Sequence, residues 1–188
     1  MKMELERTNR LTPVRRAKTL WLVDDSQVYR EFLAERFGQE DDLNCTRQFS
    51  SAEAALVALV DGPPPEVILL DVNMGGMSGV DAVRPIKSLA PTTRVLMLTS
   101  LYNSRAEADA LRAGACGFLL KVDDFNKILD WVRNPQPVQR PAWLDAIKPQ
   151  GPPPAINLRP PSLAPDGVTK GIRLFQWLFR STLPKART

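Results

Sequence analysis

Five polar side chains follow apolar runs in the chain, and together they could bind a metal ion and take part in phosphoryl transfer. Asp24 and Asp25 follow one run, and Asp71 follows a second. Thr99 and Lys121 end two further runs. Clustered carboxylates repel one another unless a cation lies between them, and oxygen ligands with open water positions suit Mg²⁺. A carboxylate can also be a nucleophile that forms an aspartyl phosphate, while a lysine and a hydroxyl bind the transferred oxygens.

Each of these residues also has a local explanation. Asp24 and Asp25 could cap a following helix, and Asp71 could stabilise a turn. Thr99 could be a hydroxyl at a strand end, and Lys121 could be a solvated surface charge. Any one of them alone favours the local explanation, whereas five at the ends of apolar runs favour a shared site.

The apolar runs predict five strands, separated by segments of helical periodicity. Ser26 is expected to cap the first helix, and Ser50 or Ser51 the second, which the Gly-Pro-rich residues 62–65 end. Pro85 is expected inside the third helix or at a break in it. The predicted strands are 19–23, 43–49, 67–71, 94–98 and 117–121, and the predicted helices are 28–37, 54–59, 80–89, 107–113 and 125–132.

Strands that alternate with helices at this spacing predict a doubly wound α/β fold, with a parallel sheet and helices on both faces. Right-handed crossovers place the carboxyl ends of all the strands at one edge of the sheet. We therefore expect the five polar side chains to meet at that edge.

Residues 19–133 resemble the receiver domain of two-component response regulators. The resemblance rests on the Asp24-Asp25 pair and on three segments, which are LLDVNM with Asp71, LMLTS with Thr99 and Ser100, and GFLLK with Lys121. It implies a flavodoxin-like, five-stranded parallel sheet in the order 2-1-3-4-5. The receiver is most similar to the branch that usually carries helix-turn-helix outputs.

The resemblance also implies roles for single residues. Asp71 would accept a phosphoryl group from a histidine kinase or a phosphotransfer protein. The metal ion would be Mg²⁺, and its protein ligands would be Asp24, Asp25, Asp71 and the backbone carbonyl of Asn73. The chain would not be an enzyme acting on other substrates, but a phosphoacceptor that catalyses its own phosphorylation and dephosphorylation.

Three further residues belong to the implied switch. Thr99, with Ser100 beside it, and Lys121 would contact the phosphoryl oxygens, and Phe118 stands at the aromatic switch position of the family. The alternative for Phe118 is an ordinary core aromatic. Two positions depart from the family pattern, because Gly75 and Val122 stand where proline is common. Since a cis bond before a residue other than proline costs about 2.5–4 kcal/mol, we expect a trans Lys121–Val122 bond.

Composition excludes several other classes. The chain has 188 residues, no histidine and two cysteines, so a zinc site of the usual ligands is not expected. Cys45 and Cys116 would lie on opposite edges of the sheet and cannot form a disulfide. The first 18 residues lack the apolar core of a secretory signal, and no apolar run approaches the ~20 residues that span a bilayer. We therefore expect a cytoplasmic protein.

The chain is expected to have five parts, because its charge and proline content change sharply along it. A basic arm (1–18) precedes the acidic receiver (19–134), which is followed by a proline-rich linker (135–166) with an extended conformation. Residues 167–183 predict an amphipathic aromatic helix, and residues 184–188 form a basic tail end.

The amphipathic segment 170–180 must bury its apolar face somewhere. It could dock on the receiver, in the groove of a partner protein, or on an anionic membrane surface as a peripheral contact. No helix-turn-helix pair fits in the tail and no recognition helix is evident, so direct DNA binding is not expected.

The function expected from all these features is a phosphorylation switch that signals to an output protein by protein–protein contact. One alternative is a non-switching scaffold or adaptor that acts through the aromatic helix. The other is a phosphatase with Asp71 as nucleophile. Such a phosphatase would need a second aspartate two residues further on, where Asn73 stands.

Overall fold

The computed structural model describes residues 16–134 of the chain. This part holds the whole of the predicted receiver (19–134). The predicted linker (135–166), aromatic helix (167–183) and tail end (184–188) lie outside the described residues, as does most of the basic arm. Those assignments stay predictions.

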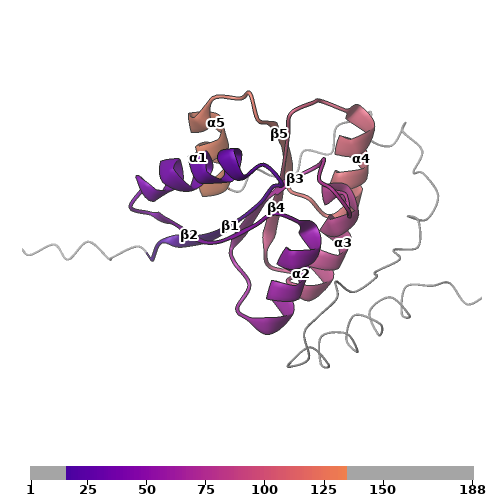
Figure 1. Ribbon diagram of the computed structural model, residues 1–188, viewed down its shortest axis with the longest axis horizontal. Coiled ribbons are helices and arrows are strands. Elements are labelled where there is room, and N and C mark those ends of the chain that lie inside the picture. The colour runs from indigo at the N-terminus through magenta and orange to yellow at the C-terminus, as the bar shows by residue number, and fades with distance from the viewer. Residues whose placement is uncertain (1–15, 135–188) are drawn as a thin grey trace, which may run out of the picture.

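Five strands form one parallel sheet in the order β2-β1-β3-β4-β5 (Figure 1). All four pairs of neighbouring strands are parallel, as predicted from the alternation of strands with helices. This order confirms the flavodoxin-like arrangement. The strands are β1 (Lys18–Val23), β2 (Leu43–Phe49), β3 (Val67–Asp71), β4 (Arg94–Thr99) and β5 (Gly117–Leu120).

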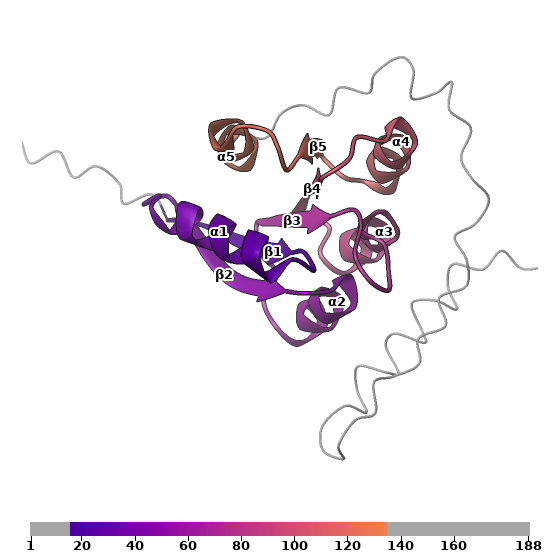
Figure 2. The ribbon, with the colours of Figure 1, turned by 45° about the horizontal axis from the view of Figure 1, so that its top comes forward.

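Five helices cover the two faces of the sheet (Figure 2). Two of them, α1 and α5, lie on one face, and the other three lie on the opposite face. The doubly wound fold is therefore confirmed. The helices are α1 (Gln27–Gly38), α2 (Ala52–Asp61), α3 (Gly79–Leu89), α4 (Ser104–Ala113) and α5 (Phe125–Arg133).

Alternate residues of the central strands supply the two halves of the core. On β1, Trp21 and Val23 belong to the cluster beneath α2, α3 and α4, while Leu20 and Leu22 belong to the cluster beneath α1 and α5. Every residue of β3 is buried. A central strand covered on both faces has no solvent side, which explains why its sequence is apolar without alternation.

Helices α1 and α2 begin at predicted serine caps, whereas α4 begins earlier than predicted. Ser26 and Ser51 cap α1 and α2 by accepting hydrogen bonds from backbone N–H groups three residues on. The helix predicted from residue 107 begins earlier, at Ser104, because the Asn103 side chain accepts bonds from two backbone N–H groups of its first turn. Apolar spacing could not show that turn, since its residues are polar or small.

Pro85 lies inside α3, whose buried residues on either side, Val83 and Ile86, pack into the core. Cys45 and Cys116 are both free thiols, associated with strands at opposite edges of the sheet. The 16–134 region contains no cis peptide bond, so the Lys121–Val122 bond is trans as predicted. Within that region, no helix is long and apolar enough to cross a membrane.

Candidate functional site

The carboxyl edge of the sheet brings the five predicted polar residues together. Two ladder hydrogen bonds continue past the strand ends and fix the backbone there. The Asp24 amide donates to the Phe49 carbonyl at 3.1 Å, and the Lys121 amide donates to the Thr99 carbonyl at 2.7 Å. Asp71 and Thr99 are themselves the last residues of β3 and β4. The backbone of these site residues is therefore held in place by the sheet.

Three carboxylates form an acidic cluster at this edge. Asp24, Asp25 and Asp71 each place a carboxylate oxygen within 4.8 Å of the others. Asp24 and Asp71 are buried, and Asp25 is exposed to solvent. Hard oxygen donors at this spacing, with one side open to water, fit a Mg²⁺ ion.

Burial and the neighbouring charged groups shift the pKa of Asp71. Loss of solvent is the main cause that raises its pKa, and the nearby Asp24 carboxylate raises it further. The Lys121 ammonium group and the Asn73 amide lower the pKa in part without reversing the shift. The carboxylate of Asp71 is therefore poorly compensated, and an added cation would stabilise its charged form.

The Lys121 ammonium group bridges two of the acids. Its Nζ atom lies 2.6 Å from Asp24 Oδ2 and 3.0 Å from Asp71 Oδ2. Burial alone would lower the pKa of Lys121, but the hydrogen bonds to Asp24 and Asp71 outweigh burial and raise it. Lys121 thus stays charged and sits where it can transfer its contact from Asp71 to an incoming anion.

Tyr29 of α1 supports the lysine and was not predicted. Its hydroxyl donates a hydrogen bond of 3.4 Å to the Lys121 carbonyl, and its ring lies 4.9 Å from the Lys121 Nζ atom. Burial and the nearby Asp24 and Asp71 carboxylates raise the pKa of Tyr29 to about 12. It therefore stays a neutral phenol that can donate to the carbonyl and face the ammonium group.

Thr99 is fully buried at the end of β4, with its hydroxyl engaged on two sides. The hydroxyl accepts from the Leu101 backbone N–H at 3.4 Å and lies 3.3 Å from the Leu101 carbonyl. The Asn73 side-chain amide donates to the same Thr99 oxygen at 3.4 Å. The loop after β4 is therefore tied directly to the hydroxyl that would contact a phosphoryl group.

Asn73 also contacts Asp71, since its backbone N–H donates a hydrogen bond to Asp71 Oδ1 at 3.4 Å. Phe118, three residues before Lys121, packs against the core as a half-buried ring. Its edge contacts Tyr102, with ring centroids 6.4 Å apart at 88°. Ser100 is exposed beside Thr99. The roles of these residues in binding or switching stay predictions.

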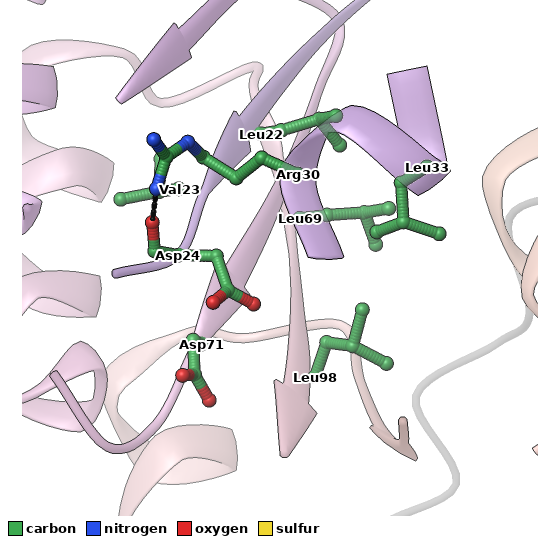
Figure 3. A pocket seen from close by; sticks show the side chains of 8 residues that line it. All are labelled: Leu22, Val23, Asp24, Arg30, Leu33, Leu69, Asp71 and Leu98. Carbon is green, nitrogen blue, oxygen red and sulfur yellow. Dashed lines mark hydrogen bonds between the residues drawn. The ribbon is translucent and has the colours of Figure 1, made fainter. Parts of the chain in front are cut away.

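A small cavity adjoins Asp24 and Asp71, the two buried members of the acidic cluster (Figure 3). Arg30 of α1, a second residue not predicted from sequence, lines it and donates from Nη1 to the Asp24 backbone carbonyl at 2.5 Å. The leucine and valine side chains that line the cavity shield one side of Asp71 from solvent. The remaining lining residues are Leu22, Val23, Asp24, Leu33, Leu69, Asp71 and Leu98.

A doubly wound sheet with a buried aspartate, two neighbouring acids, a bridging lysine and a buried threonine defines a receiver-type domain. Residues 20–133 match the response regulator receiver domain family, and the chain belongs to that family.

The similar proteins include regulators of the branch expected from the sequence. The DNA-binding transcriptional activator DevR/DosR of Mycobacterium tuberculosis is 34% identical over 102 residues, which cover 54% of this chain and 46% of that protein. The chain spans about half the length of the curated relatives it matches.

Two solved structures show the same fold. The signal receiver domain of the response regulator NarL from Mycobacterium tuberculosis has a TM-score of 0.58 at 28% identity, covering 63% of this chain and 94% of that one. A response regulator from Burkholderia pseudomallei, solved with a phosphorylated aspartic acid, a calcium ion and citrate, has a TM-score of 0.54 at 29% identity. That match covers 60% of this chain and 65% of the Burkholderia chain.

Proposed function

We propose that this protein is a phosphorylation-dependent signalling switch. Asp71 accepts a phosphoryl group from a histidine kinase or a histidine phosphotransfer protein. The observation that carries this proposal is the buried Asp71 carboxylate, 3.0 Å from the Lys121 ammonium group and within 4.8 Å of two further acids. A carboxylate so placed has both a nucleophilic oxygen and the means to neutralise the charge of a phosphoryl group.

Asp24, Asp25, Asp71 and the Asn73 backbone carbonyl would hold Mg²⁺. When bound, the ion supplies charge neutralisation and orientation for the phosphoryl oxygens. Burial is the main cause that raises the pKa of Asp71, and the Asp24 carboxylate adds to it. A hard cation among these carboxylates would offset both effects by stabilising the charged form of Asp71.

The transfer step uses side chains of this chain. One Asp71 carboxylate oxygen forms a bond to phosphorus, and the bond from phosphorus to the donor nitrogen breaks, with the electron pair leaving on the donor. The Lys121 Nζ atom moves its contact from Asp71 Oδ2 to a phosphoryl oxygen. Water later attacks the phosphorus, which regenerates the Asp71 carboxylate and releases inorganic phosphate. The chain in this way catalyses its own phosphorylation and dephosphorylation.

The switch begins at Thr99. Its hydroxyl exchanges the Leu101 contacts for a phosphoryl oxygen, which frees the loop after β4 to move. Phe118 then turns inward and changes the surface around α4 and β5. The changed surface is recognised by an output protein in the cytoplasm, and the signal passes by protein–protein contact.

Phosphotransfer profiling tests this proposal. The full chain is incubated with Mg²⁺ and each member of a panel of autophosphorylated histidine kinases and phosphorylated histidine phosphotransfer proteins. We expect one or a few of these donors to transfer label within seconds to minutes and the others to transfer it far more slowly. Transfer from no kinase and from no phosphotransfer protein in the panel would contradict a histidine-derived donor.

A further inference from the structure

The loop between β3 and α3, residues 72–78, carries Asn73 and is secured at both ends. At its start the Asn73 backbone N–H bonds to Asp71 Oδ1, and at its end the Gly79 N–H donates to the Val72 carbonyl at 3.0 Å. Between these ends lie Gly75 and Gly76, and Gly76 has a φ of 90°. Two adjacent glycines give the middle of the loop little stiffness of its own.

Glu53, in the first turn of α2, supplies a contact at this weak point. Its Oε1 atom accepts a hydrogen bond from the Met77 backbone N–H at 2.8 Å. The carboxylate fits closely against the loop, because a Cβ atom built on Gly76 would lie 2.7 Å from the same oxygen. The φ of 90° at Gly76 favours glycine at this position, since other residues rarely adopt that backbone conformation.

The second carboxylate oxygen of Glu53 makes this contact unusual. Oε2 is buried and has no hydrogen-bond partner among residues 16–134. Leaving a carboxylate oxygen buried without a partner is unfavourable, and a glutamate that only favoured the helix start could keep both oxygens in water. The Glu53 side chain thus makes its contact with the loop although one of its carboxylate oxygens loses solvent and gains no hydrogen bond.

We infer that Glu53 is a positioning residue for the Asp71 site. By fixing Met77 it holds loop 72–78 in one conformation, and so presents the Asn73 carbonyl to the metal ion before the ion arrives. A preorganised ligand loses less conformational freedom on binding, which raises the affinity for the ion. This inference rests on the proposed function, because it concerns the Mg²⁺ site that phosphorylation of Asp71 requires.

Two substitutions separate the reach of Glu53 from its charge. Glu53→Gln keeps the length of the side chain and the Oε1 acceptor but removes the negative charge. In the native chain that charge also stabilises the start of α2 through the helix dipole. Glu53→Asp keeps the charge but is one methylene too short to meet Met77. If the hydrogen bond to Met77 positions the loop, the glutamine variant should match the native chain in loop order and Mg²⁺ affinity, and the aspartate variant should not.

The test is a ¹⁵N NMR titration of the full chain with Mg²⁺, combined with amide exchange at Met77. In Glu53→Asp we expect faster exchange of the Met77 amide and a dissociation constant for Mg²⁺ raised about fivefold, the effect of roughly one hydrogen bond. In Glu53→Gln we expect both quantities within about twofold of the native chain. Equal Mg²⁺ affinity in the aspartate variant and the native chain would overturn the inference, and so would weakened binding in the glutamine variant alone.

The titration does not depend on phosphorylation, so the two proposals fail separately. If the native chain takes up no phosphoryl group but Glu53→Asp still weakens Mg²⁺ binding, the proposed function is wrong and the loop assignment stands. If the native chain is phosphorylated on Asp71 and Glu53→Asp binds Mg²⁺ normally, the loop assignment is wrong and the proposed function stands.

Discussion

Asp71→Asn is expected to take up no phosphoryl group from any donor, while the domain stays folded. An amide is not nucleophilic at oxygen in the way a carboxylate is, so no acyl phosphate can form at this position. The measurement is intact mass after incubation with Mg²⁺ and a small phosphodonor. Asp130→Asn, on the exposed side of α5, is the matched control and should be labelled like the native chain.

The fold should survive this substitution because asparagine has nearly the same shape as aspartate. One negative charge is removed from a crowded cluster, and Lys121 keeps its 2.6 Å contact with Asp24. We expect a melting temperature no lower than that of the native chain. Labelling of Asp71→Asn at the native level would show that the phosphoryl group is carried elsewhere.

Asp25→Ala is expected to abolish the response to Mg²⁺ and to lower the rate of phosphorylation by at least about 100-fold. A metal ion stabilises the charge of such a transition state by several kcal/mol, and each 1.36 kcal/mol corresponds to tenfold in rate. Asp25 is the exposed member of the cluster, so its truncation leaves the core undisturbed. The measurement is the phosphorylation rate as a function of Mg²⁺ concentration.

The control for Asp25 is Asp41→Ala, which removes an exposed carboxylate from the loop before β2. It should respond to Mg²⁺ like the native chain, and a chelator should stop labelling of both. Undiminished labelling of the native chain in the presence of a chelator would show that the acidic cluster does not act through a metal ion.

The sequence was sufficient to predict the sheet and the membership of the acidic cluster. β3 is apolar throughout and flanked by turn residues, so it could be recognised as a central strand without tertiary information. Once five strands alternate with helices, chain connectivity alone brings the carboxyl ends to one edge. The positions of Asp71, Thr99 and Lys121 follow from that geometry.

The supporting residues could not be predicted in the same way. Tyr29 and Lys121 are 92 positions apart in sequence, and their contact depends on how the first turn of α1 approaches the turn that follows β5. Arg30 and Glu53 each look like an ordinary polar residue in the first turns of a helix. Their contacts are made with the backbone of other segments, which carries no side-chain signature in the sequence.

The most direct test of the central claim is the chemistry of the label on the native chain. The full chain is treated with Mg²⁺ and a small phosphodonor, and then analysed by intact mass and by peptide mapping with and without hydroxylamine. We predict the addition of one phosphoryl group, located on Asp71 and removed by hydroxylamine as expected for an acyl phosphate. A label that resists hydroxylamine or maps to another residue would contradict the assignment of Asp71 as phosphoacceptor, as would the absence of any label.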